Sequence, residues 1–356
     1  MNFSRRLPGV ALGATLLVFL LSGCSLVNDA GQVWDILDAD AAAKKALNAV
    51  VNDVQGIKGV ESVSSNFVAD GPHGDEAAIE VVASAEITDD QLSAIATAVH
   101  EGFARADLVT AIPEFTLNFA AADEAGAFVQ SEMLLTMEEF VHEVVYWRSV
   151  EAAAETGLSL TVTPAGQDGA YQRLFETPEN ADPIRTSKLF MSHFEALAAV
   201  PDETRMPTIW SLAGIWLTPE LPSAETMAVF DDIQTFIPVM DRITPTDDLE
   251  TAEYVSPEGT LLQSFATGDD GVSRAEILIV HHDFRAANWQ TVVEAAALAA
   301  RVPEISFRYI AADRPFQVTT CARSVNQTDD DVKFLDEVRA TGAPGIDAVK
   351  AGVCSV

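Results

Sequence analysis

The feature that most constrains the fold is a proline that recurs at nearly equal intervals along the chain. Pro113, Pro207 and Pro303 stand 94 and 96 residues apart, each after an amphipathic helical pattern and before an apolar run typical of a strand. Intervals this regular favour an internal repeat, in which each copy is one structural unit. The alternative is coincidence, because prolines are common just past the ends of helices.

The first copy has the clearest pattern, in the order helix, strand, strand, helix, strand. Strands are expected at 60–68 and 79–87, because apolar and polar residues alternate in the second and a Gly- and Pro-rich turn at 70–74 divides them. Residues 88–91, Thr-Asp-Asp-Gln, match a capping box, which predicts that a helix begins there. The next strand is expected at 115–119, where Phe and Leu alternate with Thr and Asn.

The same order is expected twice more, and the second copy should end with one apolar strand at 209–217. A final strand at Phe316–Cys321 and a helix from Thr328 extend the last copy. Paired strands with helices on one side favour an α+β class over a doubly wound parallel sheet. The prediction is therefore tandem αββαβ modules, each with a small antiparallel-rich sheet and helices packed on one face. The expected modules are 39–122, 130–220 and 223–356.

This order of elements resembles BON-type envelope modules and ferredoxin-like folds. The resemblance rests on the order alone, without a diagnostic motif. It implies a non-catalytic binding role.

The N-terminus predicts an address outside the cytoplasm. Arg5 and Arg6 precede an apolar run over 10–21, which is too short to span a bilayer, and the run closes with Leu21-Ser22-Gly23-Cys24. These four residues resemble the bacterial lipobox, which implies that residues 1–23 are a signal peptide and that Cys24 receives diacylglycerol, with its two acyl chains, and becomes the first residue of the mature protein. Two acyl chains anchor a protein stably. The alternatives are an uncleaved anchor helix and an ordinary secretory signal.

The expected location is therefore the extracytoplasmic face of the cell membrane, with 24–38 as a tether to the folded body. The membrane would be contacted through the lipid on Cys24.

The net charge of −33 restricts the partners. Nucleic acid is excluded as a partner, because its phosphates require a basic patch, and an anionic lipid surface would repel this body. The charge has two interpretations: a solvated surface that resists aggregation, or an acidic face that gathers cations or basic partners.

Two cysteines, Cys321 and Cys354, remain once Cys24 is assigned to lipid. An even pair in an oxidising compartment predicts a disulfide that fastens the C-terminal tail. The alternative is a catalytic thiol, which needs a nearby histidine and a positive environment.

Candidate catalytic and metal-binding residues are few. The sequence contains none of the glycine-rich phosphate loops, hydrolase motifs or zinc motifs that we sought, and no cofactor is expected. His281, His282 and Asp283 follow an apolar strand and form a weak metal candidate, since neighbouring strand residues point to opposite faces. The alternative is a solvated strand end.

Two further groups each have a functional and a structural interpretation. His142 and Glu143 are either a general acid–base pair or part of a half-buried helix face. Trp147, Trp210 and Trp216 either line a ligand groove or pack in the core.

The leading functional hypothesis is a lipid-anchored extracytoplasmic protein with a non-catalytic binding or scaffolding role at the cell envelope. The partner, whether protein or small molecule, is not specified by the sequence. The alternatives are a solute-binding lipoprotein of a transporter, which needs two lobes around a cleft, and a secreted hydrolase.

Overall fold

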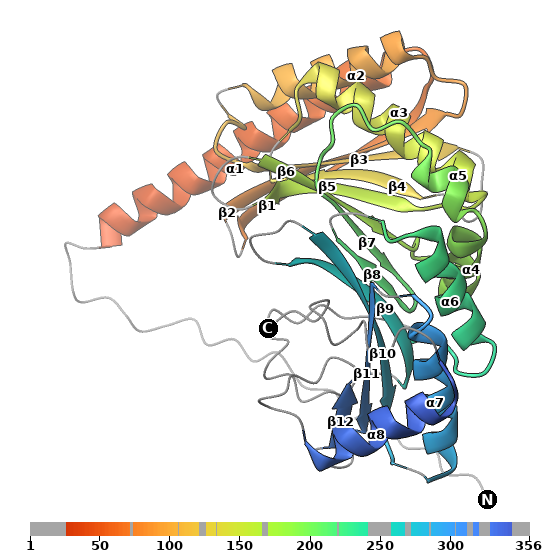
Figure 1. Cartoon of the computed structure of the whole chain (residues 1–356). Helices are drawn as coiled ribbons and strands as arrows, with labels where there is room; N and C mark the ends of the chain where they lie inside the picture. The colour runs from red at the N-terminus through yellow and green to blue at the C-terminus, as the bar shows by residue number, and fades with distance from the viewer. Residues whose placement is uncertain are drawn as a thin grey trace, which may run out of the picture.

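One continuous sheet runs through the chain. The computed structural model describes residues 26–343 except 72–73, 106, 121–125, 133, 166–169, 219–220, 241–257, 268–271, 285, 303, 312–315 and 320–327. The strands among these residues form a single twelve-stranded sheet in which their spatial order equals their order in sequence. Helices line the outer side of the curved sheet, so that the whole resembles an arc (Figure 1).

The elements follow one another as α1 (Leu26–Gln55), β1 (Val60–Gly71), β2 (Gly74–Ser84), α2 (Asp89–Phe103), β3 (Ile112–Ala120), β4 (Ala127–Ser131), α3 (Met137–Ala154), β5 (Ser159–Ala165), β6 (Ala170–Glu176), α4 (Pro183–Ser192), α5 (Phe194–Ala198), β7 (Thr208–Leu212), β8 (Ile215–Leu217), α6 (Ala224–Gln234), β9 (Gly259–Thr267), β10 (Val272–His281), α7 (Ala286–Ala299), β11 (Ile305–Ala311), β12 (Phe316–Thr319) and α8 (Asp329–Ala340).

After α1, the structure repeats a unit of two strands and a helical segment. The two strands of each unit are antiparallel, and the second is parallel to the first strand of the next unit. A parallel neighbour requires a crossover connection, and α2, α3, α4 with α5, α6 and α7 supply it. Helices of successive units contact one another along the outer side.

The strands from β2 to β8 bury alternate side chains against these helices. Ile79, Val81, Phe115 and Leu117 of β2 and β3 are almost completely buried, and they belong to one apolar cluster that runs from Ala43 to Val338. Burying each large side chain of this kind contributes about 1.5–3 kcal/mol to the free energy of unfolding. The core is therefore continuous from one end of the sheet to the other.

The opposite face of the sheet, called here the open face, changes character along its length. Over the first strands it carries exposed or half-buried polar residues such as Glu80, Thr116 and Thr161. Over the last strands it is more buried: Leu261, Leu278, Val280 and Met240 form a second, smaller apolar cluster there, beside the ion pair of Glu276 with Arg308 at 2.7 Å. The two ends of the open face therefore offer different chemistry.

The structure combines helices and strands, as predicted, and its helices pack on one face of the sheet. The predictions of tandem αββαβ modules and of small, antiparallel-rich sheets are wrong, because one sheet unites the described strands. Parallel and antiparallel pairs alternate through one sheet. Local periodicity identified strands without showing that the last strand of one unit pairs with the first of the next.

The predicted unit also lacked a strand. The prediction did not include β4, and the strand expected at 209–217 is the hairpin β7–β8, which turns at Gly214 in the left-handed region with φ 69°. A Cβ at Gly214 would lie 2.7 Å from Val239 side-chain atoms, so glycine suits both the turn and the close approach. With the added strands, each interval of 94–96 residues spans two strand–strand–helix units.

The three prolines therefore recur at the same interval as pairs of strand–strand–helix units. Pro113 lies in β3 and Pro207 directly precedes β7, while Pro303 lies outside the described residues and β11 begins at Ile305. Two antiparallel steps separate β3 from β7 and β7 from β11, so these three strands run in the same direction. The intervening β5 and β9 run in the opposite direction.

Candidate functional site

A large hollow lies on the open face at one end of β1 to β5. Its volume is about 700 Å³, and we call it the acidic hollow because Glu76, Glu114 and Glu132 line it. Val68, Ile112 and Pro164 contribute apolar surface to the same lining.

Strand pairing places the three glutamates at the same end of neighbouring strands, since Glu76 of β2 pairs with Ile112 and Ala78 pairs with Glu114 of β3. Glu76 in β2 lies opposite Val68 of β1, and Glu114 in β3 lies opposite Ser131 of β4. Glu132 follows β4 in the left-handed region with φ 71°, and its N–H donates to the carbonyl of Pro113 over 3.1 Å. The hollow therefore combines negative charge with an apolar lining, a combination suited to a cation that carries a hydrocarbon stem.

A hydrogen-bonded row continues the polar character toward the middle of the same strands. The Glu80 carboxylate accepts a hydrogen bond from Ser64 Oγ at 3.2 Å and another from Asn118 Nδ2 at 2.9 Å. These three residues come from β1, β2 and β3. The row fixes Glu80 on the open face as an additional negative charge.

The second feature is a buried ion cluster beneath the helices. Arg173 in β6 is 1% exposed, and its Nε and Nη2 donate to Glu143 of α3 over 2.6 and 2.8 Å. Its Nη1 and Nη2 also donate to Asp202, over 2.7 and 2.9 Å. The hydroxyl of Thr204 accepts a further bond, and the Tyr146 ring centroid lies 4.1 Å from the guanidinium carbon.

The cluster perturbs the titration of its members. Burial raises the pKa of Tyr146 to about 12. Partial burial alone would raise the pKa of Asp202, but the hydrogen bond and charge of Arg173 outweigh it and hold that pKa below its usual value. For Arg173, burial would lower the pKa, and Glu143 and Asp202 raise it above the usual value.

Every nitrogen of the Arg173 guanidinium donates a hydrogen bond within the protein. A hollow of about 410 Å³ adjoins the cluster. A ligand there could engage Arg173 only by breaking an existing bond. The cluster therefore ties α3, β6 and the segment before β7 together.

The structure separates the two residues that the sequence offered as an acid–base pair. Glu143 is buried against Arg173, whereas His142 is exposed, with its Nε2 3.9 Å from a Glu203 carboxylate oxygen. Sequence reasoning missed Arg173 and Asp202. A buried arginine in a strand has no local signal, because its partner Glu143 lies 30 residues earlier.

The weak metal candidate gains no support. His281 packs against Tyr309 with ring centroids 5.6 Å apart, and burial lowers its pKa. His282 and Asp283 are exposed, and the His282 N–H donates to Glu258 over 2.6 Å. Among the described residues, no group of three His, Cys, Asp or Glu side chains is placed to hold a metal ion.

The three cysteines, Cys24, Cys321 and Cys354, lie outside the described residues. Lipidation and the disulfide stay predictions. Of the tryptophans, Trp147 and Trp210 pack in the core. Trp216 lies on the open face beside the smaller apolar cluster.

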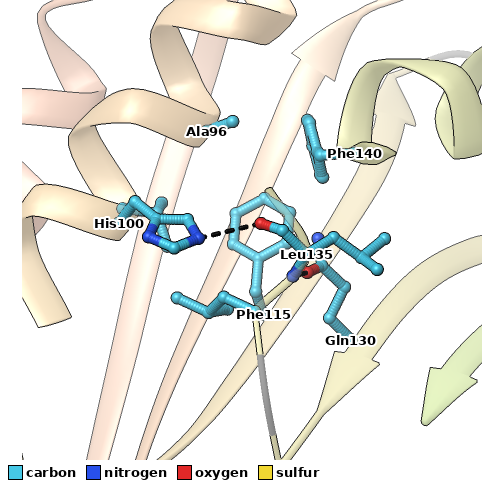
Figure 2. Close-up of a pocket in the computed structure, with 8 residues that line it drawn as sticks. Ala96, His100, Phe115, Gln130, Leu135 and Phe140 are labelled. Atoms are coloured by element: carbon cyan, nitrogen blue, oxygen red, sulfur yellow. Dashed lines mark hydrogen bonds between the residues drawn. The ribbon is translucent and has the colours of Figure 1, made fainter. Parts of the chain in front are cut away.

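A small cavity lies between α2 and the start of α3, and the side chains around it leave little free volume. Figure 2 shows His100 and Gln130 flanking the Leu135 backbone, whose carbonyl lies 2.8 Å from His100 Nε2 and whose N–H donates to Gln130 Oε1 over 2.8 Å. The cavity measures about 10 Å³, which suits about one water molecule. It is too small for an organic ligand.

Comparison with protein-family models, curated proteins and solved structures yields no match to this chain. The described helices include none that is long and apolar enough to cross a membrane.

Removing Arg173 should strongly destabilise the fold. The Arg173→Met variant leaves Glu143 buried without its cation, which costs about 3–5 kcal/mol in the free energy of unfolding. The double variant Arg173→Met/Glu143→Leu removes the orphaned charge and should recover a large part of that loss, since Asp202 is 28% exposed. Urea unfolding measures both. A double variant as unstable as the single one would contradict this account.

Glu151 should make stability depend on pH near neutrality. Its carboxylate on α3 accepts the N–H groups of Leu158 at 3.0 Å and Gly126 at 3.3 Å, and burial raises its pKa to about 7 from 4.5. The contribution of Glu151 to the free energy of unfolding is fully present below pH 4.5 and is lost as the pH rises through 7.

The Glu151→Gln variant keeps an oxygen acceptor without a charge. Its free energy of unfolding should fall less between pH 5 and 8 than that of the unmodified protein, as measured by urea titrations at each pH. Parallel curves for the two proteins would refute the assignment.

Proposed function

We propose that this chain is a lipid-anchored extracytoplasmic protein that binds a partner, without catalysis, on the open face of its sheet. The observation that carries the binding role is the acidic hollow of about 700 Å³ on that face. Repeat proteins use extended surfaces of this kind to bind partners.

Two further observations support the proposal. The lipobox-like Leu21-Ser22-Gly23-Cys24 favours anchoring at the membrane. The ion cluster around Arg173 uses its charges to join structural elements, which favours a structural role over a catalytic one. The alternative of a solute-binding lipoprotein needs two lobes around a cleft, and a single sheet that unites the described strands does not favour it.

Anchoring is tested at Cys24. The Cys24→Ser variant should move from the membrane fraction to the soluble extracytoplasmic fraction, because the lipid supplies the attachment. Immunoblots of fractionated cells measure the distribution. A variant that stays in the membrane after a high-salt wash would show a second anchor.

Binding is tested by photocross-linking in intact envelopes. A benzophenone amino acid in place of Thr116, which lies on the open face, should give a discrete adduct with a partner. The same group at Glu138, exposed on α3 on the helical side, is the control. Equal adducts at both positions, or none at Thr116, would contradict a binding role for the open face.

A further inference from the structure

The first strand of the sheet presents a long edge. Within the described part of the chain, β1 pairs with β2 alone, and the register between them is regular from Ser62 to Val68, with irregularities confined to the two ends. The 12 residues of β1 include no proline, lysine or arginine, which are common protections of an edge strand. The described β12 at the opposite edge has four residues.

This edge borders the acidic hollow. Asn66 and Val68 of β1 contribute to its lining, and Val68 is 40% exposed. A strand added beside β1 would lie roughly 4.8 Å from it and would place every second side chain on the open face. Those side chains would stand beside Val68, one strand away from Glu76, which lies opposite Val68.

The negative charge of the acidic hollow determines which kind of segment could bind beside β1. The hollow has three carboxylates, and a lysine or arginine side chain entering it could cover Val68 and Ile112 with its stem while its charge faces the carboxylates. A second copy of this chain would bring another net charge of −33 to the same place, which opposes self-association. The favoured occupant is a basic segment of a different protein.

We propose that the β1 edge and the acidic hollow bind an extended, Lys- or Arg-containing segment of a partner protein by strand addition. The main chain of the segment pairs with β1, and alternate basic side chains enter the hollow. This inference rests on the proposed function and specifies the chemistry of the partner.

The charge requirement is tested with the detergent-solubilised full chain and a fluorescent, acetylated octapeptide of alternating Lys and Thr. The triple variant Glu76→Gln/Glu114→Gln/Glu132→Gln should bind this peptide about tenfold more weakly by fluorescence anisotropy. The control Glu101→Gln/Glu138→Gln/Glu225→Gln removes the same charge from exposed positions on α2, α3 and α6 and should bind as the unmodified protein does. Circular dichroism verifies that both variants fold.

Strand addition is tested with two peptides of the same sequence that are N-methylated at alternate residues, one at the even and one at the odd positions. Only one edge of an added strand faces β1, so one methylation pattern should abolish binding and the other should preserve it.

Three results would overturn the inference. Equal weakening by both triple variants would indicate general charge attraction, and equal binding of the two methylated peptides would exclude strand addition. Dimerisation of the chain by sedimentation that the peptide reverses would identify a second copy as the occupant. Should the cross-link at Thr116 persist in these cases, binding on the open face stands and only the basic strand is rejected. If the cross-link at Thr116 is absent as well, the proposed function is also rejected.

Discussion

The alternation of antiparallel and parallel pairing is the constraint on which the rest of the structure depends. An antiparallel step needs only a tight turn, but every parallel step obliges the chain to return along the sheet through a crossover. The crossover helices all contact the same cluster of buried strand residues, so they accumulate on one side. The other side is left to interact with whatever lies outside it, which is why the polar strands and the acidic hollow meet there.

Polar interactions then locate particular helices against this sheet. Helix α3 makes three such contacts: Glu143 with Arg173, Glu151 with the N–H groups of Gly126 and Leu158, and Trp147 Nε1 with the Leu158 carbonyl at 2.5 Å. Apolar packing is tolerant of sliding, whereas buried charges and directed hydrogen bonds are satisfied in one position. The geometry of the open face therefore depends on contacts made on the opposite side of the sheet.

Local sequence patterns predicted many of the individual helices and strands, but they predicted little of how these elements pair and pack together. The capping box of Thr88 with Gln91 and the strand alternation around Ile79 and Leu117 both appear in the structure. The strand Ala127–Ser131 and the turn at Gly214 were missed, because they are short and lack strong periodicity. The continuity of the sheet and the burial of Arg173 depend on partners distant in sequence, for which one sequence carries no local signal.

The reversal of direction between successive units has a consequence for chirality. When strands advance in one direction across a sheet and the helices stay on one face, crossovers from upward and from downward strands have opposite hands. Helices α2, α4 with α5, and α7 therefore share one hand, and α3 and α6 share the other. Strand twist favours right-handed crossovers in nearly all parallel pairs. At least two connections in this arc thus have the hand that strand twist disfavours.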